Sequence, residues 1–161
     1  MSANINIMEI PNMDLAYVLS IGPQNVENAY GKLIQWATTQ GLMNDQTKMV
    51  TIYHDSFKVT EANRVMMSAA ILLNKTIEAR GEIGLTSIKA GKYIVGSFEI
   101  ALSEFEKSWT GLFLWMNDNG YEKADRDVFE IYHNNFNEHS KKRQLWTFIY
   151  RLHKITRLNE G

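Results

Sequence analysis

VFEIYH, residues 128–133, ends in the triplet Ile131-Tyr132-His133, and the same triplet ends MVTIYH, residues 49–54, 79 positions earlier. Both stretches predict short strands, because β-branched and aromatic residues dominate them. A triplet shared at a fixed offset indicates an internal repeat, and a repeat governs the organisation of the whole fold.

The offset of 79 also aligns residues on both sides of the triplet. Trp36 falls on Trp115 and Gly41 on Gly120, and tryptophan is rare enough for its pairing to carry weight. The same register, without a gap, pairs Glu27 with Glu106, Leu33 with Leu112, Arg64 with Arg143, Leu73 with Leu152, and Lys75 with Lys154. We therefore expect a single domain, residues 1–161, made of two copies over roughly residues 13–75 and 92–154.

Each copy predicts the order strand, helix, strand, strand. Apolar residues at helical spacing mark the helices, and Trp36 and Trp115 are expected in the core. Gly41 and Gly120 end the two helices, and Ser103 with Glu106 has the spacing of a capping box. The predicted strands are residues 15–19, 49–53 and 65–73 in the first copy, and 93–98, 128–132 and 145–152 in the second.

The predicted fold class is α+β, a tandem duplication of a β-α-β-β unit. We expect an antiparallel sheet in each half, with helices on one face and a ligand groove at the pseudo-twofold axis, where the other faces meet. Residues 76–92 are expected to connect the copies.

The clearest difference between the copies is Glu130, which stands where the first copy has Thr51. Because side chains alternate along a strand, Phe129 and Ile131 share one face, expected to be the helix-packed core. Glu130 and Tyr132 then share the other face with Thr51 and Tyr53. From spacing alone a solvated strand carboxylate is favoured, since Glu is rarely buried without a partner. The alternative is a carboxylate lining a cavity, where aromatic neighbours would help it to bind a lipophilic cation.

Composition excludes several classes of protein. The net charge is −1, from 17 basic and 18 acidic residues, so there is no electrostatic footprint for nucleic acid. The chain has no cysteine, which excludes disulfides and thiolate chemistry. No signal peptide or membrane-spanning stretch is present in the sequence, so a cytoplasmic protein without membrane association is expected.

No cofactor, metal site or catalytic residue is predicted. His133, Glu138 and His139 lack the spacing of a compact ligand set and are expected in a solvated loop. Phosphate-binding loops and the motifs of serine hydrolases and zinc proteases do not occur.

Three stretches resemble the GyrI-like family, which comprises effector-binding domains of AraC-type and MerR-type regulators and relatives such as gyrase inhibitory proteins. They are AYV to IGP (residues 16–23), IYHD (52–55), and residues 90–132, which contain NGYE (119–122) and FEIY (129–132). The resemblance covers roughly residues 5–155. It departs from the family in the last strand, where Arg151 stands near the usual proline and Ile149 replaces a common aromatic residue.

The resemblance implies a groove in which a buried glutamate, here Glu130, contacts cationic ligands. Tyr53 and Tyr132 match wall positions, and Thr51 and Ile149 complete the expected ligand-binding set. The resemblance thus favours the ligand-binding interpretation of Glu130 over the solvated one. Trp146 or Arg151 could decide whether the groove is open.

About a dozen residues precede the first predicted strand, too few for a helix-turn-helix domain, so direct DNA binding is not expected. We expect a stand-alone domain that binds or senses hydrophobic, cationic small molecules of drug or dye type, and not an enzyme. One alternative is a protein-interaction module of the gyrase-inhibitor type, with a protein partner. The other is a small hydrolase that uses the groove carboxylate to activate water.

Overall fold

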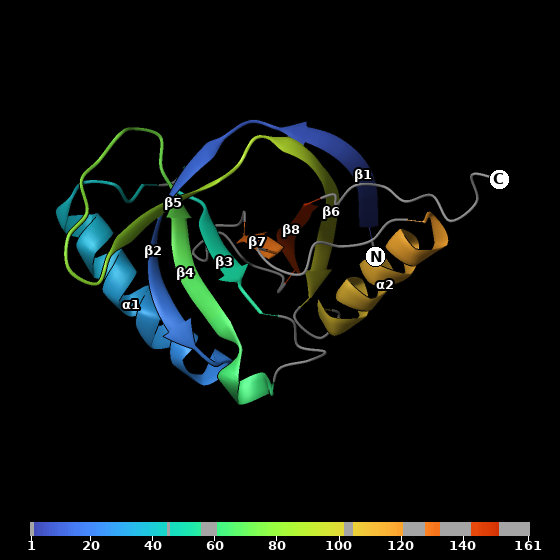
Figure 1. The fold of residues 1–161 in the computed structure, drawn as a ribbon, viewed down its shortest axis with the longest axis horizontal. Coiled ribbons are helices and arrows are strands. Elements are labelled where there is room, and N and C mark those ends of the chain that lie inside the picture. Colours follow the sequence, from blue (N-terminus) through green and yellow to red (C-terminus); the bar gives the residue numbers. More distant parts are fainter. Residues whose placement is uncertain are drawn as a thin grey trace.

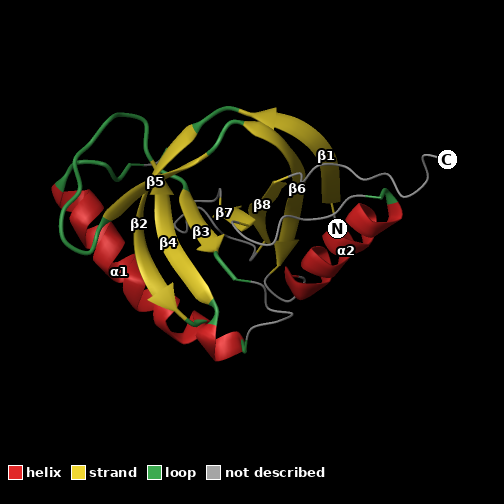
Figure 2. Cartoon of the chain, viewed as in Figure 1, coloured by secondary structure: helices red, strands yellow, loops and turns green. Residues whose placement is uncertain are grey.

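The computed structural model describes residues 2–44, 46–55, 61–101, 105–120, 128–132 and 143–151. Figures 1 and 2 show a strongly curved sheet with helices beside it in this part of the chain. The helices are α1 (Pro23–Thr39) and α2 (Phe105–Asp118), and a short 3-10 helix, η1, spans Ala62–Arg64. The strands are β1 (Ser2–Ile10), β2 (Met13–Ile21), β3 (Met49–Tyr53), β4 (Met66–Leu72), β5 (Gly84–Ile88), β6 (Gly91–Ala101), β7 (Val128–Tyr132) and β8 (Arg143–Arg151). None of the helices in the described residues is long and apolar enough to cross a membrane.

The strands form one eight-stranded sheet in the order β1-β6-β8-β7-β3-β4-β2-β5, with every pair antiparallel. The α+β class with antiparallel strands is therefore confirmed. The expectation of one sheet in each half is wrong, because β3 pairs directly with β7 and joins the halves. Figure 1 shows α1 beside β2 and β4 at one end, and α2 beside β6 at the other.

Two strands, β1 and β5, were missed from the sequence. β1 precedes β2 in the chain but pairs with β6 in the other half, and β5 precedes β6 but pairs with β2. The halves therefore exchange their first strands. The segment 76–92, expected to be a connection, contains β5.

The bounds of β3 and β7 differ by the offset of 79 residues. Between β2 and β6 the offset is 78. Ile71 and Tyr150 are 79 residues apart, but their strand partners, Ala16 and Ile94, are 78 residues apart. A one-residue shift exchanges the two faces of a strand, so the sequence offset alone would have misplaced β6. The tandem duplication itself stays a prediction that this arrangement supports.

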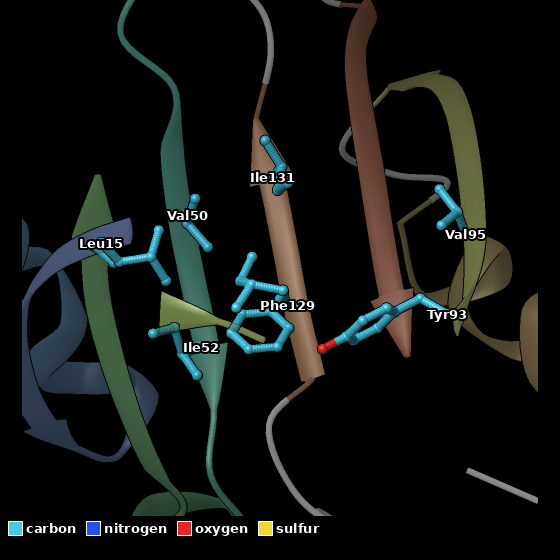
Figure 3. Packing of buried hydrophobic residues seen from close by; sticks show 9 residues of the cluster. Leu15, Val50, Ile52, Tyr93, Val95, Phe129 and Ile131 are labelled. Carbon is cyan, nitrogen blue, oxygen red and sulfur yellow. The ribbon is translucent and has the colours of Figure 1, made fainter. Parts of the chain in front are cut away.

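The sheet has a buried cluster on each face. The helix-facing cluster contains Leu33 and Ala37 of α1 packed on Val18, Ala69 and Ile71. The opposite cluster contains no helical residue, and Figure 3 shows its side chains pointing toward one another from strands across the sheet. Its members are Leu15, Val50, Ile52, Ala70, Ile88, Tyr93, Val95, Phe129 and Ile131.

Phe129 and Ile131 therefore lie on the face away from the helices, and the prediction that they pack against a helix is wrong. Thr51 lies between Val50 and Ile52, so it faces the helix side, as does Met49, which packs against the helix-facing cluster. Both faces of β7 are largely buried and the helix-facing side of β3 is half-buried, which weakens the polar–apolar contrast that normally identifies the core face.

Glycines end the helices as predicted. Gly41 and Gly120 have φ of 69° and 75°, a backbone conformation that favours glycine directly after a helix. The amide of Gly41 donates to the Thr38 carbonyl, and that of Gly120 to the Asn117 carbonyl. The capping box predicted from Ser103 falls outside the described residues.

Gly96 sits where β6 meets α2, and we expect Gly96→Ala to destabilise the fold. An added Cβ would lie 2.7 Å from the Phe98 ring and 3.2 Å from Leu112, so the ring would have to move. Overpacking of this kind costs about 1–3 kcal/mol of unfolding free energy, measurable by urea denaturation. Gly111→Ala is the control, because a Cβ at that helical position meets nothing within 4 Å and raises helix propensity. Equal effects of the two substitutions would contradict this packing.

Candidate functional site

The candidate site lies where β3 and β7 meet in the middle of the sheet. The register places Glu130 directly opposite Thr51, with Tyr53 opposite Val128. The helix-facing side of these two strands thus brings together Thr51, Tyr53 and Glu130 from the two halves of the chain.

Glu130 is buried, with 4% of its surface exposed, although it is a carboxylate in the centre of a sheet. The Tyr53 hydroxyl donates a hydrogen bond of 2.6 Å to its Oε2 atom. Within the described residues this is the only hydrogen bond to Glu130, and none of their basic side chains forms an ion pair with it. The spacing-based interpretation of a solvated carboxylate is therefore wrong.

Tyr30 of α1 completes this part of the site. Its hydroxyl donates to the Val50 carbonyl at 2.7 Å and lies 2.6 Å from Thr51 Oγ1. With its own proton directed to Val50, Tyr30 accepts the proton of Thr51, so the Thr51 hydroxyl is directed to Tyr30. The tyrosine thereby fixes α1 to β3 next to Glu130.

The sequence alone did not assign Tyr30 to the site. The sequence contained one signal that it does more, because a tyrosine in an apolar helical stripe needs a partner for its hydroxyl when it is buried. The partner is on β3, 20 residues away in the chain, and helical spacing does not reveal it.

The burial of the site changes its acid–base properties. Burial raises the pKa of Glu130 from its ordinary value of 4.5 to about 7, while the hydrogen bond from Tyr53 acts in the opposite direction. Burial also raises the pKa of Tyr30. The hydrogen bond with Thr51 lowers this pKa, and the negative charge of Glu130 raises it further.

Two other predicted site residues lie further along these strands. Tyr132 is two residues beyond Glu130 on β7, so it shares the helix-facing side, and it is buried. Ile149 on β8 pairs with Phe129 and Val95, both members of the cluster on the opposite face. The position that pairs with Glu130 is Phe148. The role of Ile149 as a ligand contact therefore stays a prediction.

Other candidate sites are weaker. Within the part of the chain that the structure describes, no group of three or more His, Cys, Asp and Glu side chains could hold a metal ion. His133, Glu138 and His139 lie outside the described residues. A shallow depression of about 370 Å³ is lined by residues 12–14 and 72–76, none of which belongs to the Glu130 site.

We expect Tyr30→Phe to lower the unfolding free energy by about 1–2 kcal/mol, because it removes a buried hydroxyl that serves both Val50 and Thr51. Chemical denaturation measures this loss. Tyr17→Phe is the matched control, since the described residues give the Tyr17 hydroxyl no hydrogen bond, and its effect should stay within about 0.5 kcal/mol. An unchanged unfolding free energy in Tyr30→Phe would show that the hydroxyl does not help to fix α1 to β3.

The family model described as GyrI-like small molecule binding domain matches residues 3–150. Similar sequences include two proteins named DNA gyrase inhibitor. The Citrobacter rodentium protein is 24% identical, over 81% of this chain and 86% of its own length. The Escherichia coli K12 protein is 26% identical, over 71% of this chain and 76% of its own length.

Solved structures share the fold at low sequence identity. The EcmrR C-terminal domain superposes with a TM-score of 0.75 at 18% identity, over 96% of this chain and all of that domain. In the EcmrR–DNA complex the match covers 95% of this chain and only 58% of the EcmrR chain. A Listeria innocua structure described as a hydrolase gives 0.66 at 13% identity, over 92% and 91% of the two chains. SAV2435 bound to tetraphenylphosphonium gives 0.56 at 8% identity, over 93% and 94%.

Proposed function

The chain belongs to the GyrI-like small molecule binding domain family, and we propose that it binds a hydrophobic cation at Glu130. The observation that carries this proposal is a carboxylate buried in the centre of the sheet with one neutral donor, Tyr53. An ionised group in such surroundings is strongly destabilised unless a positive charge accompanies it. Among the described side chains no cation does so, and a positively charged ligand would supply it.

The neighbours of Glu130 suit an aromatic, lipophilic cation. The hydroxyl of Tyr30 from α1 bonds to Thr51, and that of Tyr53 from β3 bonds to Glu130 itself. A cation over a desolvated phenol ring gains about 0.5–2 kcal/mol. Micromolar affinity requires about 8 kcal/mol, much of which burial of an aromatic ligand would provide. The similarly folded SAV2435 has been solved with tetraphenylphosphonium, a cation of this class, which supports the choice of probe.

The test is a fluorescence-anisotropy titration with a cationic aromatic dye and, in parallel, with an uncharged analogue of the same shape. We expect micromolar binding of the dye and at least tenfold weaker binding of the analogue, because only the cation offsets the buried charge. Equal affinities would indicate an apolar groove that does not recognise charge. No binding to a folded protein would reject the proposal.

We further propose that the ligand is bound without chemical change. In support, the Tyr53 hydroxyl is directed to Glu130 and that of Tyr30 to the Val50 carbonyl, so neither proton is directed to a substrate. A hydrolase would need a water positioned against Glu130 as a general base. Incubation with a panel of cationic esters, followed by chromatography, should return them intact.

A protein-interaction module is the second candidate, and exposed apolar residues on β2 and β4 favour it. Ile21 pairs with Met66, and Leu19 lies on the same face; these side chains are 54%, 38% and 49% exposed. The relatives named DNA gyrase inhibitor suggest gyrase as the protein to try. In a supercoiling assay, inhibition that is lost in a Leu19→Ser, Ile21→Ser double variant would favour this function.

A further inference from the structure

The described side chains around Glu130 are tyrosines and neutral groups, and no described lysine or arginine forms an ion pair with it. β7 packs against β3 and β8, and α1 approaches through Tyr30. The described titratable groups around Glu130 are Tyr53 of β3, which bonds to it, Tyr30 of α1, which bonds to the opposite Thr51, and Tyr132, two residues along β7. A positively charged side chain in this position would keep the carboxylate ionised, whereas a neutral phenol supplies no positive charge.

β8 contributes its register positions. Phe148 pairs in the ladder with Glu130, and Trp146 pairs with Tyr132. The two basic residues of the strand, Arg143 and Arg151, pair in the ladder with Ala101 and Tyr93 of β6. The ladder partner of Glu130 on β8 is therefore an apolar residue.

We propose that this site exchanges a proton for its cation, so that Glu130 is a carboxylic acid in the free protein and a carboxylate in the loaded one. The O–H bond of the acid breaks, the proton passes to solvent, and the positive charge of the ligand replaces it. The net charge of the site is then the same in both states. This inference rests on the proposed function and specifies how binding is regulated.

The hydrogen bond from Tyr53 is compatible with both states. Because Tyr53 donates to Oε2, the acid proton of the free protein sits on Oε1, and the same bond stabilises the carboxylate after that proton leaves. Glu130 therefore keeps the same hydrogen-bond donor, Tyr53, when the cation binds. Tyr53 acts here as a positioning residue that sets how readily the proton is lost.

The acid–base properties of Glu130 give the size of the effect. With a pKa of about 7 in the free protein, roughly 0.9 proton should be released per cation at pH 6, 0.5 at pH 7 and 0.1 at pH 8. The apparent Kd for the cation should rise about tenfold between pH 8 and pH 6, since the protonated form must first ionise.

The experiment is isothermal titration calorimetry of the full chain with tetraphenylphosphonium, repeated at each pH in phosphate and in MOPS, two buffers that accept protons near pH 7 with different ionisation enthalpies. The probe is permanently charged and cannot titrate, so any proton that enters the buffer comes from the protein. The difference in heat between the two buffers, divided by the difference in their ionisation enthalpies, gives the number of protons released. We expect that number to fall from roughly 0.9 per cation at pH 6 to roughly 0.1 at pH 8.

Two variants and one ligand serve as controls. Glu130→Gln should release no proton at any pH, and neither should triphenylphosphine oxide, a neutral analogue, with the unmodified protein. Tyr53→Phe keeps the ring but removes the bond that lowers the pKa of Glu130, so it should increase proton release at pH 8. A merely structural role of Tyr53 would leave that proton count unchanged.

The outcomes separate the two claims. Tight binding with the same heat in both buffers, from pH 6 to pH 8, would overturn proton exchange and leave the binding function standing. No binding to a folded protein would overturn the proposed function and this inference with it.

Discussion

Glu130→Gln should weaken the binding of a permanently cationic aromatic ligand at pH 8 by 30-fold or more. The substitution leaves shape and volume nearly unchanged, and the amide oxygen can still accept the hydrogen bond from Tyr53. What it removes is the negative charge opposite a desolvated cation. Loss of one partner of a buried charge pair costs about 2–5 kcal/mol, at tenfold in affinity per 1.4 kcal/mol.

Fluorescence anisotropy at constant ionic strength measures this loss. Glu9→Gln is the matched control, because Glu9 is an exposed acid on β1 and its removal changes the net charge equally. Its affinity should stay within about twofold, since exposed charges are screened by salt. If Glu9→Gln and Glu130→Gln weakened binding equally, the effect would come from overall charge and not from the buried site.

The second large effect concerns stability and pH in the ligand-free protein. Glu130 has a higher pKa in the folded chain than in the unfolded chain, so the folded state holds its proton more tightly. The contribution to stability is therefore fully present below about pH 4.5 and is lost as the pH rises through about 7. A shift of this size corresponds to about 3 kcal/mol of unfolding free energy.

Urea denaturation of the wild type and of Glu130→Gln at pH 5 and pH 8 isolates this contribution. Other carboxylates titrate in both proteins, so the informative quantity is the difference between them. At pH 8 the variant should be the more stable by an amount that shrinks on going to pH 5. A difference independent of pH would mean that Glu130 has the same pKa in the folded and unfolded chains.

The sequence predicted the central part of the fold from a few residues. The shared triplet located β3 and β7, the helical spacing located α1 and α2, and the predicted C-terminal glycines, Gly41 and Gly120, have positive φ. It also singled out Glu130, because a difference between two otherwise similar strands is visible without a structure.

The assignment of faces failed for a physical reason. Alternation shows that Phe129 and Ile131 share a face, but not which face the helices cover. Here both faces of β7 are buried, one against the helix side and one in a core without helices, so apolar character does not identify the helix-packed face. Glu130 consequently lies on the helix side, next to Tyr30, and not on the face opposite the helices.

The remaining differences come from contacts between distant parts of the chain. β1 carries Asn4 and Asn6 among apolar residues and is defined by its pairing with β6, about ninety residues away. Tyr30 enters the site through a hydrogen bond to β3. None of these pairings has a periodicity that could be read from one sequence.

The most direct test of the account is a crystal structure of the protein with tetraphenylphosphonium. We predict that the phosphonium lies beside the Glu130 carboxylate, within about 6 Å of the rings of Tyr30 and Tyr53, on the helix-facing side of β3 and β7. A cation found elsewhere, for example in the depression lined by residues 12–14 and 72–76, with Glu130 still buried and without a positive partner, would contradict it.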